Sequence, residues 1–354
     1  MSILDRYLWK ATLTGFVMAW FALVTLIFFF TFIAETGKTS ELYTTSQAFI
    51  YLVYTIPGLL YEHFPTSILI GALLGLGNLA ANSEFTAMRA AGISIRQIIF
   101  SVVKLGLVLA CLIFIAGEWL VPATDLHARN FKAHLKNKNI TLVGGAGLWV
   151  KEKNTIFHIG KVIKKEQLAD ISIYTFEHNY AGLKSIKTVE SANFVDDSWQ
   201  LEDINTSTFK ETSINKKHQD KEINRQFIDP QILDVATVDA EQLSTNALKK
   251  IIKHQKDNQL KTDKYELIYW KRYSVPLSAL VMLVIAMPFL FGSNRGGGAG
   301  TRVFLGVIVG IAFFLANRAI NELGIVYGFS PMLSAFVPSL LFLSVGLFAL
   351  SRIR

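Results

Sequence analysis

Six long apolar runs, separated by polar segments, dominate the pattern of the chain. They cover residues 11–34, 45–81, 98–121, 267–291, 302–325 and 331–350. A membrane-crossing helix takes about 20 apolar residues, so every run is long enough to cross a bilayer. The pattern predicts an α-helical membrane protein with six transmembrane helices (3+3). We expect an N-terminal half over residues 1–123, an insert over 124–264 and a C-terminal half over 265–354.

The insert changes from helical to alternating periodicity. Its β-rich runs cover residues 147–151, 155–163, 171–176, 183–190 and 193–210. In one of them Ile171 and Ile173 alternate with Ser172 and Tyr174. This alternation, with turn residues between the runs, is typical of an antiparallel all-β domain, and we predict a jellyroll-like or sandwich fold. Ser244 is a candidate cap for a connecting helix before the fourth span.

The second apolar run holds two prolines, Pro57 and Pro65, with Glu62 and His63 between them. Proline removes a backbone donor and strains a helix interior, so we expect this run to be broken or kinked. Two interpretations stay open. The run has a polar bend that serves a function in the membrane, or its first part is a helix outside the bilayer that carries Glu62 and His63 in water.

Two pairs of glycines in the apolar runs have the GxxxG spacing. Gly71 and Gly75 lie in the second span, and Gly306 and Gly310 lie in the fifth. Small residues at this spacing let a second helix approach closely. The spacing is common in apolar helices, so it predicts tight packing and no particular function.

Composition supports a membrane protein, and charge adds an orientation. The chain is 51% hydrophobic and 18% charged, with a formal net charge of +8. The even-numbered connections and the two ends of the chain hold Arg6, Lys10, Arg89, Arg96, Arg295, Arg302, Arg352 and Arg354. The odd-numbered short connections hold Glu35, Lys38, Glu41 and Glu322. By the positive-inside rule, both termini are expected in the cytoplasm and the insert in the periplasm, which excludes a DNA-binding role for the insert.

The sequence offers no catalytic residues. Glycines near residue 300 precede Thr301 and Arg302 without the Gly-Lys-Ser/Thr of a Walker A motif, so we do not expect the chain to hydrolyse nucleotide. The seven histidines form no HExxH motif, and Cys111, the single cysteine, lies in an apolar run. We therefore expect a non-enzymatic protein without a metal or cofactor of its own.

The connection between the second and third spans has the pattern of a short cytoplasmic helix over residues 83–94. Ser83 is a candidate N-cap, and Glu84 suits the positive end of the helix dipole. Gly92 is a candidate helix end.

This helix has the residues that docking into a partner's groove requires. Phe85 and Met88 supply apolar anchors at i and i+3, and Glu84 and Arg89 supply directional charges. One interpretation is a helix that inserts into a groove of a separate ATPase. The other is a passive connector that lies on the membrane surface.

Motifs spread along the chain carry a family resemblance. The longest is Gly71-Ala-Leu-Leu-Gly-Leu-Gly-Asn-Leu-Ala80, followed by Ser83-Glu84 and Met88-Arg-Ala-Ala-Gly92. Shorter ones are Leu4-Asp5-Arg6-Tyr7, Gly117-Glu118-Trp119, Ile171-Ser-Ile-Tyr174, Trp270-Lys271, Pro276-Leu-Ser278, Val326-Tyr-Gly328 and Pro338-Ser339. Together they resemble the LptF/LptG family, the permeases of the bacterial lipopolysaccharide export transporter, and its LptG branch more than its LptF branch.

The resemblance implies a permease subunit in the bacterial inner membrane. Such a subunit extracts lipopolysaccharide from that membrane and passes it to a periplasmic bridge toward the outer membrane. The implied partners are an LptF subunit, two copies of the ATPase LptB, which bind ATP and Mg, and the single-span protein LptC. By motif, Ser83 to Gly92 correspond to the coupling helix, with Glu84 as its acidic contact to the ATPase. The nearest rival, a lipoprotein-exporting permease, usually has four spans with its insert after the first.

The resemblance also implies substrate contacts at the outer end of the first span. Lys38 corresponds to a basic position near the lipid-facing entrance and is a candidate partner for lipopolysaccharide phosphates. The chain departs from some relatives, which carry lysines where it has Thr31 and Gly58. Phe32 suits an acyl chain, or equally bulk lipid.

Arg318 in the fifth span is a candidate substitute for the missing lysines. An ionisable side chain in apolar surroundings is a functional-site hypothesis. The alternative is an ion pair with Glu322, one helical turn away.

Overall fold

A computed structural model describes most of the chain. The described residues are 2–40, 43–135, 148–164, 166–177, 182–196, 198–210, 213–224, 240–291 and 299–352. Some residues used in the charge and motif arguments lie outside them: Glu41, Arg295, Arg354, the glycines 296–298 and the side chain of Arg302.

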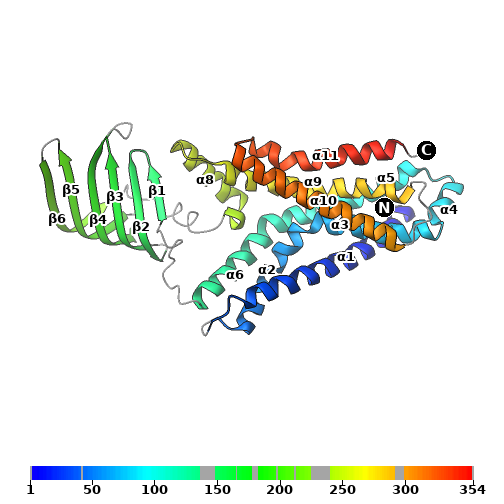
Figure 1. The fold of residues 1–354 in the computed structure, drawn as a ribbon, viewed down its shortest axis with the longest axis horizontal. Helices are drawn as coiled ribbons and strands as arrows, with labels where there is room; N and C mark the ends of the chain where they lie inside the picture. The colour runs from blue at the N-terminus through cyan, green and yellow to red at the C-terminus, as the bar shows by residue number, and fades with distance from the viewer. Residues whose placement is uncertain are drawn as a thin grey trace. The chain divides into compact units, whose positions relative to one another are not determined.

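Six helical segments in the described part of the chain are long and apolar enough to cross a membrane. They are α1 (Ile3–Thr36), α3 (Phe64–Ala81), α5 (Ile95–Ile115) continued by the π-helix η1 (Ala116–Leu120) and α6 (Val121–Leu135), α9 (Asp263–Phe291), α10 (Ala299–Tyr327) and α11 (Pro331–Ser351). Three precede the β domain and three follow it (Figure 1). The predicted α-helical membrane fold with an inserted β domain is confirmed.

The second apolar run is broken, as its prolines predict. It forms α2 (Thr45–Glu62) and α3, which are separated at His63. Pro65 lies in the first turn of α3, where a proline has no helical hydrogen bond to remove. α3 is the piece that meets the length and hydropathy of a membrane span.

Helices α3 and α9 form the buried centre of the helical unit. In the 18-residue apolar stretch of each of these two helices, 67% of the residues are buried. The corresponding share is 11% in α1 and 22% in α10. α1 and α10 both pack against α3, and α5 and α11 pack against α9. The outer helices therefore expose apolar side chains, as expected where lipid or another membrane subunit covers them.

Helices α1 and α3 touch backbone to backbone at three glycines. A Cβ atom added to Gly15 would meet the main chain of Gly71 and Gly75. One added to Gly75 would meet the carbonyl of Ala11, and one added to Gly71 the backbone of Phe16. The predicted close approach at Gly71 and Gly75 is confirmed, and its partner is the first helix.

Two further contacts hold the outer helices on the centre. Gly306 and Gly310 of α10 face the side chains of Leu73 and Thr66 on α3, so the second GxxxG spacing also marks close packing. Between α9 and α11, the hydroxyls of Ser278 and Ser339 form a hydrogen bond of 2.7 Å.

The β domain contains one antiparallel sheet in the described residues. Its strands pair in chain order: β1 (Leu148–Glu152), β2 (Thr155–Lys164), β3 (Gln167–Phe176), β4 (Leu183–Val195), β5 (Ser198–Lys210) and β6 (Ser213–Asn224). This order is a meander, and the described strands contain no Greek-key crossing of the kind a jellyroll has. One apolar row crosses four strands through Ile159, Ile171, Val189 and Ile204.

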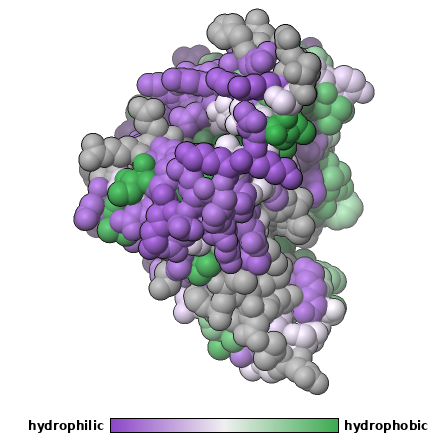
Figure 2. Space-filling view, turned by 90° about the vertical axis from the view of Figure 1, so that its left-hand side faces the viewer, coloured by the Kyte–Doolittle hydropathy of each residue, from purple (hydrophilic) through white to green (hydrophobic). Residues whose placement is uncertain are grey.

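The edge strand β6 was not predicted, because most of its side chains are polar and exposed and it lacks the alternating pattern of the other strands. Its Lys221 pairs with Glu202 of β5 at 2.9 Å. The hydrogen bonds from Lys221 and Ser191 lower the pKa of the Glu202 carboxyl. Figure 2 shows the hydrophilic surface that such residues give this domain. Charges on an edge strand oppose pairing with other chains.

The chain divides into two compact units. One comprises Met1–Thr39, Thr44–Ala128 and Asp263–Arg354, and the other comprises Ser40–Tyr43 and Arg129–Thr262. The division falls a few residues after 123 because α5, η1 and α6 form one continuous rod that outlasts the apolar run. The second unit includes α8 (Thr245–Asp257), where the Ser244 hydroxyl accepts a hydrogen bond from the Ala247 amide, so the predicted cap is confirmed.

We expect Gly75→Ala to lower the free energy of unfolding in detergent by about 1–3 kcal/mol, because its Cβ would collide with main-chain atoms that cannot rotate away. Gly306→Ala is the matched control, since its Cβ would collide only with the flexible end of Leu73 and would meet Ile70 at an ordinary contact distance. Thermal unfolding of the purified variants measures both. Equal loss in the two variants would show that the α1–α3 crossing is not special.

Candidate functional site

A seven-residue helix, α4 (Glu84–Ala90), connects α3 to α5 at one end of the helical unit, here called the α4 end. Both chain termini lie at this end (Figure 1). Gly92 ends the helix as predicted, with a positive φ of 89°. The amides of Gly92 and Ile93 donate to the carbonyls of Arg89 and Met88, both at 3.0 Å, which is a Schellman motif.

The start of α4 differs from the prediction. Ser83 has a left-handed backbone, with φ 59°, and its side chain makes no capping hydrogen bond. The helix is also shorter than the predicted 83–94, because Ser94 caps the next helix, α5, through the amide of Gln97. Gly92, which ends α4, and Ser94, which caps α5, therefore produce the turn between these two helices.

The two predicted apolar anchors point into the chain's own bundle. Phe85 is 5% exposed, and its ring lies 5.0 Å from that of Phe291 on α9. Met88 packs on the same core cluster. The prediction that Phe85 enters a partner's groove is therefore corrected, because its ring is buried in the chain's own bundle. Met88 is half-buried, so a partner contact at Met88 stays a prediction. Both side chains attach α4 to the bundle.

The outward face of α4 is made of small side chains and one cation. Thr86, Ala87, Arg89 and Ala90 are exposed. This face is the part of α4 that a second protein can contact.

The first helix reaches the start of α4. The hydroxyl of Tyr7 donates a hydrogen bond of 2.5 Å to Oε2 of Glu84. Two neighbours of Tyr7 connect α1 to α5 instead: the Trp9 indole donates to the Ser101 carbonyl at 2.9 Å, and Asp5 lies 3.8 Å from Lys104. Sequence pattern gave no sign of the bond between Tyr7 and Glu84, because 77 residues separate its partners.

Three predicted substrate residues lie at the opposite end of α1. Lys38 is 60% exposed and pairs with Glu35 at 3.1 Å. The Thr31 hydroxyl donates to the carbonyl of Ile27 in its own helix. Phe32 contacts Phe28 on α1 and Phe49 on α2, so it belongs to an aromatic cluster between these helices. Thr31 and Phe32 are adjacent in the last part of α1, and Lys38 lies in the turn that follows the helix.

Arg318 lies on α10 and is exposed. Among the described residues it has no ion-pair partner, so the expected alternative, a bond to Glu322, is absent from this part of the chain. Arg318 and Lys38 belong to different parts of the helical unit: Lys38 follows α1, Arg318 lies in α10, and both helices pack against α3.

Arg272 is a buried cation for which the sequence pattern assigned no role. It is 5% exposed, and its guanidinium donates to the carbonyl of Gly117 in η1. The ring of Tyr61 occupies the place a side chain on Gly117 would need. Arg272 thus joins α9 to η1 where the π-helix interrupts the third span, and Tyr61 packs α2 against the same residue of η1. An arginine inside an apolar helix is the signal that could have found it.

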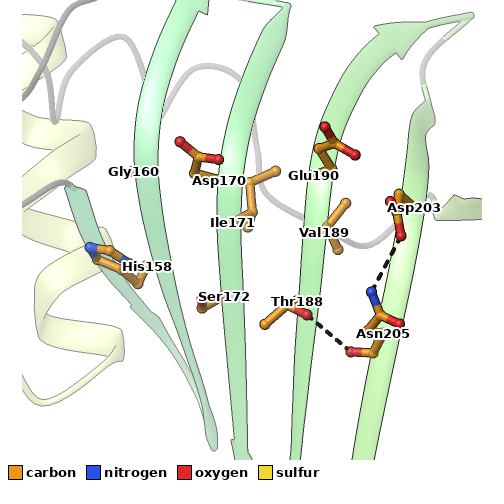
Figure 3. A pocket seen from close by; sticks show the side chains of 10 residues that line it. All are labelled: His158, Gly160, Asp170, Ile171, Ser172, Thr188, Val189, Glu190, Asp203 and Asn205. Atoms are coloured by element: carbon orange, nitrogen blue, oxygen red, sulfur yellow. Dashed lines mark hydrogen bonds between the residues drawn. The ribbon is translucent and has the colours of Figure 1, made fainter. Parts of the chain in front are cut away.

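The β domain carries a shallow polar groove of about 420 Å³ (Figure 3). Ser172 and Thr188 face it, and the Asn205 amide donates to Asp203 beside it. These polar residues alternate with buried ones such as Ile173, so the groove lies on the face opposite the apolar row. No group of three or more metal-ligating side chains occurs in the described part of the chain.

Comparison with known proteins decides the family. The family described as lipopolysaccharide export system permease LptF/LptG matches residues 6–352. The chain belongs to the LptF/LptG family. It is 32% identical to the lipopolysaccharide export system permease protein LptG of Escherichia coli (strain K12), over 99% of this chain and 98% of that protein. It is 31% identical to LptG of Haemophilus influenzae, over 100% of this chain and 99% of the relative.

This membership confirms the resemblance to LptG and excludes the lipoprotein-exporter alternative. Several motifs of the LptF/LptG resemblance coincide with helix contacts in the structure. Tyr7 meets Glu84, Ser278 meets Ser339, and Gly117 accepts from Arg272. The motif residues of an LptF/LptG permease here therefore hold helices together at the α4 end, between α9 and α11, and at the π-helix.

We expect Phe85→Ala to loosen α4, because a helix of seven residues depends on packing for its stability. Loss of a buried phenylalanine costs about 3–5 kcal/mol in a packed core. Amide hydrogen exchange in α4 should therefore accelerate at least tenfold, while the exposed Thr86→Ala variant should exchange like the wild type. Unchanged exchange in Phe85→Ala would mean that the ring does not anchor the helix.

Proposed function

We propose that the chain is a permease subunit of an ATP-driven transporter that extracts lipopolysaccharide from the inner membrane and passes it to a periplasmic bridge. Full-length similarity to LptG proteins supports the substrate. The observation that carries the ATP-driven mechanism is α4, a short helix between two spans that is anchored inward by Phe85 and open outward.

In this proposal α4 is the coupling helix. Two LptB-like ATPase subunits, which bind ATP and Mg, dock from the cytoplasm on α4 of this chain and on the equivalent helix of an LptF-like partner. The exposed small residues of α4 allow close contact, while Arg89 and the accessible part of Glu84 supply charges. Closure of the ATPase pair then moves α4, and Phe85 transfers that movement to α9.

The exposed apolar faces of α1 and α10 are the proposed lining of a cavity shared with the LptF-like partner. On α1 they comprise Val17, Met18, Phe21, Leu26, Phe29, Phe30 and Ile33. On α10 they comprise Phe304, Leu305, Ile308, Ile311 and Leu315. Such surfaces suit the acyl chains of lipopolysaccharide, and movement of the α4 end would narrow the space between them.

Cationic side chains are the proposed headgroup contacts. Lys38 can exchange its bond to Glu35 for a phosphate, and Arg318 offers a guanidinium without a partner among the described residues. Thr31 and Phe32 lie in the last part of α1, before the turn that holds Lys38. An arginine within an apolar span is costly unless it meets an anion or water, which favours a substrate contact for Arg318.

The proposed orientation places the α4 end and both termini in the cytoplasm and the β domain in the periplasm. Arg6, Arg89, Arg96 and Arg352 all lie at the α4 end, in agreement with the positive-inside rule. An LptC-like protein completes the assembly on the periplasmic side.

Glu84→Ala tests the coupling role. We expect the variant to insert and fold normally but to recover at least fivefold less ATPase when the tagged permease is purified from membranes in mild detergent. Mass spectrometry of the co-purified proteins gives the measurement. The control is Glu322→Ala, which removes an exposed carboxylate from α10 far from α4. Full ATPase recovery with Glu84→Ala would contradict the assignment.

Lys38→Gln tests the headgroup contact. Because Lys38 is exposed, we expect a loss of about two- to fivefold in the lipopolysaccharide retained by the purified complex, the range of a solvent-screened ion pair. Lys10→Gln, an exposed lysine near the other end of α1, is the control. If both variants retain as much lipopolysaccharide as the wild type, Lys38 is not a headgroup contact.

A further inference from the structure

The carboxylate of Glu84 is held from within the chain. Tyr7 donates its hydroxyl hydrogen to Oε2, and the described residues provide no other partner for Glu84. One carboxylate oxygen is therefore oriented while Oε1 remains available to a donor from outside. A phenol bound to a carboxylate is a charge-assisted hydrogen bond, so it restricts the side chain more than a neutral contact would.

The same bond connects α4 to the first span. α4 follows α3 and precedes α5 in the chain, and Phe85 attaches it to α9. Tyr7 adds a contact to α1, which is the most exposed of the six candidate spans. Asp5 and Trp9, on either side of Tyr7, instead contact α5. Among these neighbours, Tyr7 is the one whose polar group reaches α4.

We propose that Tyr7 is a positioning residue for Glu84: its hydroxyl orients the carboxylate toward the ATPase and transmits movement of α4 to α1. This inference rests on the proposed function and extends it. Movement of α4 reaches α9 through the apolar contact at Phe85, and it reaches α1 through the hydrogen bond of Tyr7. Because α1 has an exposed apolar face and Lys38 lies in the turn that follows it, a movement at Tyr7 changes the position of the substrate-facing helix.

The test is Tyr7→Phe in the purified complex of permease, partner permease and ATPase, reconstituted in proteoliposomes with lipopolysaccharide. The variant keeps the ring and loses only the hydroxyl. We expect ATPase recovery between that of the wild type and that of Glu84→Ala, because the carboxylate remains but is no longer held by Tyr7. We also expect about three- to tenfold less lipopolysaccharide released per ATP hydrolysed, the factor expected from loss of an ordinary solvent-exposed hydrogen bond.

Two controls separate positioning from general stability. Trp9→Phe removes a hydrogen bond between α1 and α5 without touching Glu84 and should release lipopolysaccharide per ATP like the wild type. The double variant Tyr7→Phe with Glu84→Ala should be no worse than Glu84→Ala alone, because Tyr7 acts through that carboxylate. An additive loss in the double variant, or an equal loss in Trp9→Phe, would overturn the inference.

Failure of the inference and failure of the proposed function give different results. Normal release per ATP by Tyr7→Phe, in a wild-type complex that does transport, overturns only the role of Tyr7. A wild-type complex that contains no ATPase or releases no lipopolysaccharide overturns the proposed function and the role of Tyr7 with it.

Discussion

The close crossing of α1 and α3 is the contact on which the other features of the helical unit depend. Gly15, Gly71 and Gly75 let the two backbones touch, and larger residues would separate them. The crossing at Ala11 and Gly75 brings the start of α1 beside the end of α3. Tyr7, one helical turn before Ala11, is thereby placed next to Glu84, which follows α3 after a short turn. Side-chain volume at three positions thus determines whether the first span reaches α4.

The arrangement explains how one short helix can act on a large bundle. α3 and α9 are buried on most sides, so they form the rigid centre, whereas α1 and α10 lie outside it with apolar faces open. α4 contacts both kinds of helix, α9 through Phe85 and α1 through Tyr7. A displacement of α4 is therefore expected to reach the buried centre and an exposed helix together. Rigid packing transmits such shifts because a close-packed interior compresses little.

The sequence predicted the features that depend on residues close together in the chain: helices, breaks and helix ends. The apolar runs predicted the six spans and the position of the insert, and the prolines predicted the break at His63. Gly92 ends α4, as expected. Contacts between distant residues were not predictable in this way. The inward direction of Phe85 depends on where Phe291 lies, and the role of Arg272 depends on a carbonyl 155 residues away. β6 was missed because its polar side chains carry no alternation. The prediction that Ser83 caps α4 was wrong, because the tight turn after α3 places this residue in the left-handed region of the backbone.

Site-specific photo-cross-linking can determine directly whether the outward face of α4 contacts an ATPase. A benzophenone amino acid would replace Ala87 on the exposed face of α4, and Phe329 at the opposite end of the bundle would serve as the comparison site. In living cells we expect an adduct between position 87 and an ATPase subunit, identified by mass spectrometry, and none from position 329. An adduct at position 87 with lipid alone, in a protein that is correctly inserted, would contradict this expectation.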